Sequence, residues 1–256
     1  KTSMILYKIY IFMTIVMVVL LLLGKLPLFD SLLLAFGTAG TGGFSILNSG
    51  CASYSPYIQY LIAIFMILFG VNFNVYYFIL IKKFKDAIHY EELKYYLLFI
   101  GASVAMITYN IHSLFPTIEQ AFRHALFQVG TVITTTGYAS TDFNKWPEFS
   151  KFILVMLMFS GACAGSTGGG MKVSRLVIML KTVKKELLSY LHPITVRKVK
   201  FNGRMVEHEV IRGINVYMIA YAFVLMFSVL IISIDNFDFT SNFKAVVATL
   251  NNFVPG

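Results

Sequence analysis

Five long apolar segments restrict what this chain can fold into. They cover approximately residues 4–23, 57–81, 95–111, 152–180 and 214–234. A helix that crosses a bilayer needs roughly 20 consecutive apolar residues, and these segments approach or exceed that length. The third is the weakest, since it is short and interrupted by Gly101, Ser103, Thr108 and Asn110. We therefore expect an integral membrane protein with five spans, the first of which is retained rather than cleaved as a signal peptide.

The distribution of charge predicts how the chain crosses the bilayer. Charged residues make up 13% of the sequence, about half the share found in soluble domains. Lysines and arginines gather in the connections 82–94 and 181–212, which should be cytoplasmic by the positive-inside rule. The connections 24–56, 112–151 and 235–256 are near neutral and should face outward. This pattern explains the net charge of +9 without nucleic acid as a partner.

No feature of the sequence indicates an enzyme or a resident cofactor. Cys51 and Cys163 fall in different contexts, and the five histidines show no metal-ligand spacing. The glycine-rich stretch 165–172 lacks the Gly-Lys-Ser/Thr ending of a phosphate loop. The glycines of 37–43 follow an apolar helical segment rather than a strand, so a dinucleotide site has no structural context. We expect neither ATP nor NAD to bind here.

Two outward connections contain a turn of threonine, glycine and an aromatic residue, which is typical of an ion filter. The residues are Thr41, Gly42, Gly43 and Phe44 in the first turn, and Thr134, Thr135, Thr136, Gly137 and Tyr138 in the second. Small residues allow backbone carbonyl groups to crowd inward and replace the hydration shell of a cation. A third connection fits the same register through Asn251, Asn252, Phe253 and Val254, with Val254 in the glycine column.

A short apolar helix of about a dozen residues is expected before each turn, too short to span and therefore re-entrant. The expected starts are Asp30 and Ser31, Pro116 and Thr117, and Thr240 and Ser241. The negative end of each helix dipole would then favour a cation at the turn. The alternative is that the small residues serve only close helix packing, which explains two turns in register less well.

The fourth apolar segment is interrupted by a glycine-rich stretch. We predict that it forms an intramembrane loop below the filter and acts as a gate, because irregular backbone at membrane depth needs surrounding protein or a water-filled cavity. The gate residues are Gly161, Gly165, Ser166, Thr167, Gly168, Gly169, Gly170 and Arg175. For Arg175, a functional role and an extension toward the cytoplasmic face remain equal alternatives. For Lys172 we favour the extension.

Several stretches resemble one transporter family. They are TGGFS from Thr41, GVNFNVYYF from Gly70, EELKYYLL from Glu91, TTTGYAS from Thr134, SGACAGSTGGGMKVSR from Ser160 and LHPITVRKVKFNGRMV from Leu191. With them the chain is similar to the Trk/Ktr/HKT superfamily of potassium transporters, and most to its TrkH/TrkG branch. The resemblance implies an all-α membrane protein in which four units of span, pore helix, filter and span surround a pseudo-fourfold pore. It also implies a homodimer in the cell inner membrane and a cytoplasmic nucleotide-binding regulatory subunit of the TrkA type.

On that plan the chain divides into four parts. Residues 1–83 would be the second unit, 84–185 the third unit with its broken inner helix, 186–207 a cytoplasmic connection, and 208–256 an incomplete fourth unit that ends in its filter. We therefore expect a fragment. Val254 departs from the NNxGPG pattern that the resemblance implies, and valine does not readily adopt a positive φ angle.

The predicted function is potassium uptake across the membrane through a filter-lined, gated pore, with potassium as substrate. One alternative is a sodium-coupled relative, which a serine at a filter glycine would favour, but Gly43 and Gly137 do not. Another is a nonconducting or truncated membrane subunit, which Val254 makes credible. Potassium or rubidium uptake by transport-deficient cells distinguishes these alternatives.

Overall fold

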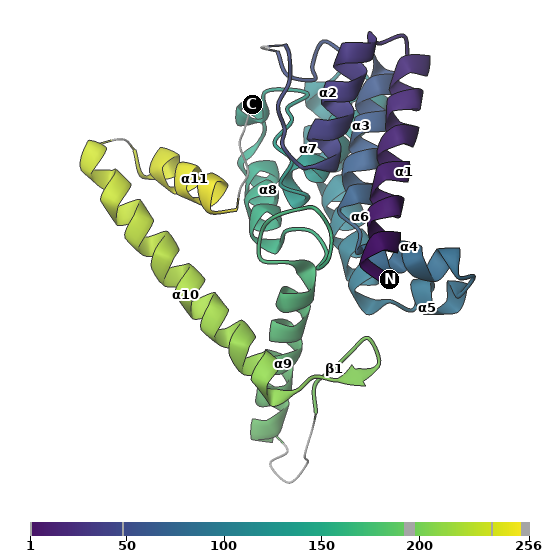
Figure 1. Ribbon diagram of the computed structural model, residues 1–256. Helices are drawn as coiled ribbons and strands as arrows, with labels where there is room; N and C mark the ends of the chain where they lie inside the picture. Colours follow the sequence, from purple (N-terminus) through teal and green to yellow (C-terminus); the bar gives the residue numbers. More distant parts are fainter. Residues whose placement is uncertain (1, 48, 192–197, 237, 252–256) are drawn as a thin grey trace.

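The protein is almost entirely helical in the computed structural model, which describes residues 2–47, 49–191, 198–236 and 238–251 (Figure 1). Helices α1 to α8 form a packed body, from which α9 (Val173–Leu191) extends. Helix α10 (His208–Ile232) diverges from this body, and α11 (Phe239–Leu250) returns toward it. The predicted helical membrane architecture is confirmed, with one short hairpin among the described residues.

The N-terminal part consists of α1 (Thr2–Leu23), the shorter α2 (Leu28–Ala39), and the pair α3 (Pro56–Phe69) and α4 (Phe73–Leu80). Helix α1 is long and apolar enough to cross a bilayer, whereas α2 has only 12 residues. The buried face of α2 has helical spacing and is formed by Ser31, Leu34, Ala35, Thr38 and Ala39. Helix α2 therefore lies among longer helices without spanning the membrane itself.

The second apolar segment is not the single span expected over residues 57–81. It bends by 88° between α3 and α4. Gly70 ends α3, and Asn72 caps α4 by accepting a hydrogen bond at Oδ1 from the Asn74 amide at 3.0 Å. A Cβ at Gly70 would lie 2.8 Å from Thr134 Cγ2, so the bend is packed against a distant segment. Hydropathy could not reveal it, because both halves are equally apolar.

The second half of the body contains α6 (Glu91–Ile111), α7 (Ile118–Ile133) and α8 (Glu148–Ser160). Helix α6 and the following turn η1 (His112–Leu114) give a 24-residue span, which confirms the weakest predicted segment. The predicted break in segment 152–180 separates α8 from α9. In the described part of the chain, three helices can span a bilayer, or four if α3 and α4 count as one span. Of the five expected spans, the fourth is broken as predicted, whereas the expectation of an unbroken second span was wrong, because that segment bends between α3 and α4.

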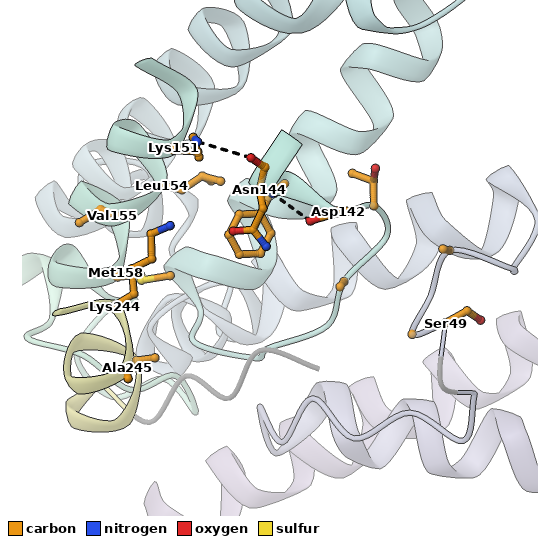
Figure 2. Close-up of a pocket in the computed structure, with 15 residues that line it drawn as sticks. Ser49, Asp142, Asn144, Lys151, Leu154, Val155, Met158, Lys244 and Ala245 are labelled. Atoms are coloured by element: carbon orange, nitrogen blue, oxygen red, sulfur yellow. Dashed lines mark hydrogen bonds between the residues drawn. The ribbon is translucent and has the colours of Figure 1, made fainter. Parts of the chain in front are cut away.

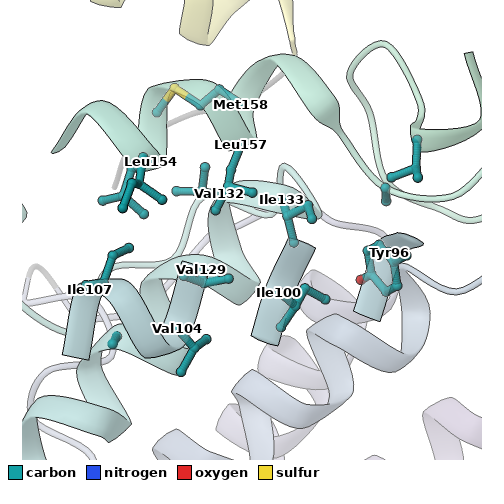
Figure 3. Packing of buried hydrophobic residues seen from close by; sticks show 14 of the residues in the cluster. Tyr96, Ile100, Val104, Ile107, Val129, Val132, Ile133, Leu154, Leu157 and Met158 are labelled. Carbon is teal, nitrogen blue, oxygen red and sulfur yellow. The ribbon is translucent and has the colours of Figure 1, made fainter. Parts of the chain in front are cut away.

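The main core lies between α6, α7 and α8 (Figure 3). Helix α6 contributes Tyr96, Ile100, Val104 and Ile107, α7 contributes Val129, Val132 and Ile133, and α8 contributes Leu154, Leu157 and Met158. Lipid tails are as apolar as these side chains, so dispersion in close packing stabilises the helix contacts more than removal from water does. This core holds the C-terminal end of α7 in a fixed position.

The starts of the short helices agree only in part with the expectation. Thr117 caps α7, and its Oγ1 accepts a hydrogen bond from the Gln120 amide at 3.2 Å. Helix α2 instead begins after Pro27, and the cap of α11 is Asp238 rather than Thr240 or Ser241. Hydrogen bonds from Ser241 lower the pKa of Asp238 below its usual value, which keeps the cap charged where the helix dipole favours an anion.

The remaining elements connect the helices. They are α5 (Phe84–Ile88), the short turns η2 (Phe143–Lys145) and η3 (Ser233–Asp235), and a hairpin of β1 (Lys200–Phe201) and β2 (Arg204–Met205). Asn202 and Gly203, with φ angles of 50° and 74°, form a two-residue turn of the kind that favours hairpins. The turn is docked on α6, since the Asn202 amide donates to Glu91 Oε2 at 3.0 Å.

Candidate ion-filter site

The two Thr/Gly turns have the same backbone conformation. Thr41 and Thr135 have φ angles of 51° and 57°, and Gly43 and Gly137 have φ angles of 68° and 97°. The hydrogen bonds repeat as well: the Gly42 amide donates to the Gly37 carbonyl at 2.7 Å, and the Thr136 amide donates to the Thr131 carbonyl at 2.9 Å. Each turn is thus the left-handed end of the short helix before it, α2 or α7.

The turns also lie against each other. A Cβ at Gly43 would lie 3.0 Å from the Cα of Gly137 and closer still to the Thr136 carbonyl oxygen. Glycine is required at this position for two independent reasons, the positive φ angle and the close approach of backbone. Segments almost a hundred residues apart in the sequence therefore present their peptide groups side by side.

Asn251 begins the third turn after α11. Its amide donates to the Val247 carbonyl at 3.1 Å, as the Thr134 amide donates to the Gly130 carbonyl at 3.2 Å. Its side chain is buried and exchanges hydrogen bonds with the Tyr221 hydroxyl. Asn252, Phe253 and Val254 lie outside the described residues, so their predicted filter positions stay predictions.

The glycine-rich stretch between α8 and α9 contacts both complete turns. The Gly169 amide donates to Thr135 Oγ1 at 2.7 Å, and Thr41 Oγ1 donates to the Thr167 carbonyl at 3.2 Å. A Cβ at Gly168 would lie 2.9 Å from the Thr134 carbonyl oxygen. The small residues thus allow an irregular segment, which we call the intramembrane loop (residues 161–172), to reach the turns.

The intramembrane loop also fills the bend between α3 and α4. The Cys163 amide donates to the Gly70 carbonyl at 3.0 Å, and the Phe73 amide donates to the Gly165 carbonyl at 3.2 Å. Unpaired backbone groups are costly at membrane depth. The two helix breaks therefore satisfy each other's backbone hydrogen-bonding groups, which explains why both can exist in one membrane protein.

Comparison with known proteins places this arrangement in a family. Residues 92–255 match the family model TrkH, described as a cation transport protein. The chain belongs to the TrkH family of cation transport proteins. Members of this membrane family transport ions and are not enzymes, in agreement with the absence of any catalytic pattern in the sequence.

Individual relatives agree with this assignment. The chain is 31% identical to the Trk system potassium uptake protein TrkH of Salmonella typhimurium, over 100% of this chain and 54% of that protein. It is 29% identical to TrkG of Escherichia coli K12, over 98% of this chain and 52% of that protein. The crystal structure of the potassium transporter TrkH from Vibrio parahaemolyticus matches with a TM-score of 0.92 and 30% identity, over 100% of this chain and 56% of that one. The chain thus spans about half the length of the curated relatives it matches.

The aromatic residues of the two turns differ in this TrkH-family chain. Phe44 is 71% exposed, whereas Tyr138 is 2% exposed. The Tyr138 hydroxyl donates to the Leu34 carbonyl of α2 at 3.3 Å and occupies the space where Gly37 has no side chain. The sequence analysis did not assign Gly37 a role. A glycine in the last turns of a short helix was the signal that another side chain packs closely there.

The two cations that follow the glycines have different partners. Lys172 does not extend toward the cytoplasmic face as expected, because its Nζ donates to the Gly168 carbonyl within the loop. Arg175 lies over the Tyr217 ring of α10, with its Cζ 4.4 Å from the ring centroid. Arg175 therefore joins α9 to α10, and its gate role stays a prediction.

Buried polar residues that the sequence did not single out complete the site. Glu92 accepts hydrogen bonds from the loop, Asn72 donates to Glu92, and the Tyr96 hydroxyl donates to the Ile67 carbonyl at 3.0 Å. The only sequence signal was an acidic residue at the very start of an apolar span. No group of three or more metal-ligating His, Cys, Asp or Glu side chains occurs in the part of the chain that the structure describes.

A cavity of about 490 Å³ lies among the segments that follow the two turns (Figure 2). Its wall includes Ser49 after the first turn, Asp142 and Asn144 after the second, and Lys244 of α11. Lys151 Nζ donates to the Asn144 carbonyl at 3.4 Å and forms an ion pair with Glu148 at 2.5 Å. Charges of both signs therefore line this space.

Proposed function

We propose that this chain forms part of a potassium uptake pore, to which it contributes two complete filter turns and the start of another. The observation that carries the proposal is the repeated left-handed backbone at Thr41 and Gly43 and at Thr135 and Gly137. Backbone carbonyl groups of such turns can replace the hydration shell of a potassium ion. The names of the similar proteins, Trk system potassium uptake proteins, support potassium as the substrate.

The carbonyl oxygens, rather than the threonine hydroxyls, are the proposed ligands. Thr134 Oγ1 donates to the Gly130 carbonyl at 2.6 Å and is 2.8 Å from Thr136 Oγ1. Thr135 Oγ1 accepts from the Gly169 amide, and the single hydroxyl hydrogen of Thr41 is shared between the Gly40 carbonyl at 2.8 Å and the Thr167 carbonyl at 3.2 Å. These hydrogen bonds hold the backbone conformation of the turns, and the proposal assigns cation coordination to the backbone carbonyl groups.

The intramembrane loop is the proposed gate. It contacts both turns, and its glycines permit conformations that other residues would resist. The short helices α2, α7 and α11 end at the turns, which directs the negative ends of their dipoles at the cation. Permeation then requires movement of a segment that is held mainly by hydrogen bonds rather than by a packed helix.

The membrane orientation and the partners complete the proposal. The basic connections around α5 and the β1–β2 hairpin lie at the same end of the molecule (Figure 1), which supports a cytoplasmic location for that end and outward filter loops. The inner membrane is the proposed site, with a homodimer and a nucleotide-binding regulatory subunit as partners. The exposed basic residues Lys200 and Arg204 suit either that subunit or anionic lipid.

Rubidium and potassium uptake tests the proposed function. The complete reading frame that encodes this chain is expressed in transport-deficient cells, unchanged or with Gly137→Ser. The substitution should lower potassium selectivity over sodium about tenfold, since ~1.4 kcal/mol of lost coordination has that effect. Gly101→Ser is the matched control, because a Cβ at Gly101 would meet no atom within 4 Å.

Two outcomes would contradict the proposal. One is absence of uptake by the complete reading frame when its protein reaches the membrane, which would favour a nonconducting subunit. The other is unchanged selectivity in the Gly137→Ser variant, which would remove this turn from the filter.

A further inference from the structure

Glu92 is a buried carboxylate that the proposed pore does not explain. Its side chain belongs to the first turn of α6, and the residue is only 1% exposed. It forms no ion pair with any residue of the described ranges. Burying a carboxylate is costly unless several hydrogen bonds satisfy its oxygens. A specific set of donors must therefore hold this group in place.

Two of those donors are backbone amides, one inside the intramembrane loop and one just after it. Glu92 Oε1 accepts hydrogen bonds from the Ala164 amide at 2.6 Å and from the Ser174 amide at 3.2 Å. Ala164 lies at the start of the glycine-rich stretch, and Ser174 lies in the first turn of α9, where the helix dipole favours an anion. One carboxylate oxygen thus links the early part of the loop to the first turn of α9.

The second oxygen connects the loop to the other helix break. Glu92 Oε2 accepts a hydrogen bond from Asn72 Nδ2 at 3.2 Å, while Asn72 Oδ1 caps α4. Hydrogen bonds to ionised groups are about twice as strong as those between neutral groups. Glu92 therefore lies where the loop, α9 and the bend between α3 and α4 meet.

We propose that Glu92 is a positioning residue that holds the intramembrane loop against the filter turns. The glycines give the loop little conformational preference of its own, so fixed acceptors must select one arrangement. Thr135 supplies such an acceptor at the filter side, and Glu92 supplies one at the N-terminal end of α6. An effect of the loop position on permeation rests on the proposed function. The positioning of the loop by Glu92 does not rest on it.

The two free cysteines provide a test within the chain. Cys163 lies in the loop and Cys51 lies in the connection after the first filter turn, and both are fully buried. The complete protein, in its membrane, is treated with N-ethylmaleimide, and labelling at each cysteine is followed by peptide mass spectrometry. Cys163 reports the position of the loop, and Cys51 reports the integrity of the rest of the fold.

Three substitutions at Glu92 separate hydrogen bonding from packing. Glu92→Met fills the space but accepts no hydrogen bond from an amide, and Glu92→Ala removes the side chain. Both should raise the labelling rate of Cys163 about tenfold and leave that of Cys51 unchanged, as expected for local opening of the loop. Glu92→Gln should give a smaller increase, because its Oε1 still accepts from the Ala164 and Ser174 amides.

Glu91→Gln is the matched control. Glu91 is the adjacent residue with the same charge, but it contacts Lys181 and Asn202 rather than the loop. Its variant should keep Cys163 protected. Protection of Cys163 in both Glu92→Met and Glu92→Gln would overturn the proposal, as would equal increases at Cys163 and Cys51 in Glu92→Gln.

Labelling requires no ion movement. Failure of Gly137→Ser to alter selectivity would contradict the filter but would leave the positioning role of Glu92 intact. Failure of the Glu92 variants to alter Cys163 labelling would contradict the positioning role but would leave the filter intact. If the alanine and methionine variants fail to accumulate, Glu92→Gln decides alone, and Cys163 labelling at the unchanged protein's rate in that variant then overturns the proposal.

Discussion

Thr41–Phe44 and Thr134–Tyr138 have left-handed residues at the same two positions, yet their aromatic side chains have opposite surroundings. Phe44 faces out of the described structure, whereas Tyr138 is buried and reaches across to the Leu34 carbonyl. The backbone of each turn is set locally, by the end of a short helix and a glycine. The role of the aromatic residue depends on its surroundings. Tyr138 of the second turn contacts α2, whereas Phe44 of the first turn is mostly exposed.

The largest expected difference is between the two aromatic residues. Tyr138→Ala should lower the free energy of unfolding by roughly 4 kcal/mol, because it opens a cavity between α2 and the second turn. Phe44→Ala should change it by less than about 0.5 kcal/mol, since an exposed side chain is removed. Thermal unfolding of the purified protein in detergent measures both. Equal losses of stability would show that the two aromatic residues have the same structural role.

A smaller effect is expected at the glycines where the turns meet. Gly43→Ala should cost roughly 3 kcal/mol, from its left-handed φ angle and from the collision of its Cβ with the Thr136 carbonyl. Gly42→Ala is the control for stability, because φ there is not left-handed and its Cβ would meet the Phe44 ring at 3.4 Å. The same unfolding measurement applies. Similar stability of the two variants would contradict the close approach of the turns.

The smallest expected effect tests the contact between the second turn and the loop. Thr135→Val leaves the Gly169 amide without its acceptor and should cost roughly 2 kcal/mol. Thr135→Ser keeps the hydroxyl and should restore most of that stability. Hydrogen exchange of the Gly169 amide gives the measurement. Unchanged protection in the valine variant would mean that the hydroxyl does not hold the loop.

Much of the site could be predicted from residues close together in the sequence. The turns, the short helices before them and the glycine-rich break were recognised from threonine, glycine and apolar patterns, because these determine backbone conformation locally. The bend between α3 and α4 could not be recognised, since neither Gly70 nor Asn72 differs from residues tolerated in a continuous span. The predicted filter roles of Asn252, Phe253 and Val254 remain open to experiment.

The sequence by itself determined a helical membrane protein with repeated Thr/Gly turns and a broken inner helix, because hydropathy, helix length and the freedom of glycine act within short stretches. Only the tertiary structure decided which side chains hold those pieces together. Glu92 and Ser174 meet across 82 positions of sequence, and Tyr138 and Leu34 meet across 104. Such pairs depend on how the helices pack, because a buried polar group can bond only to the partners that this packing brings within reach.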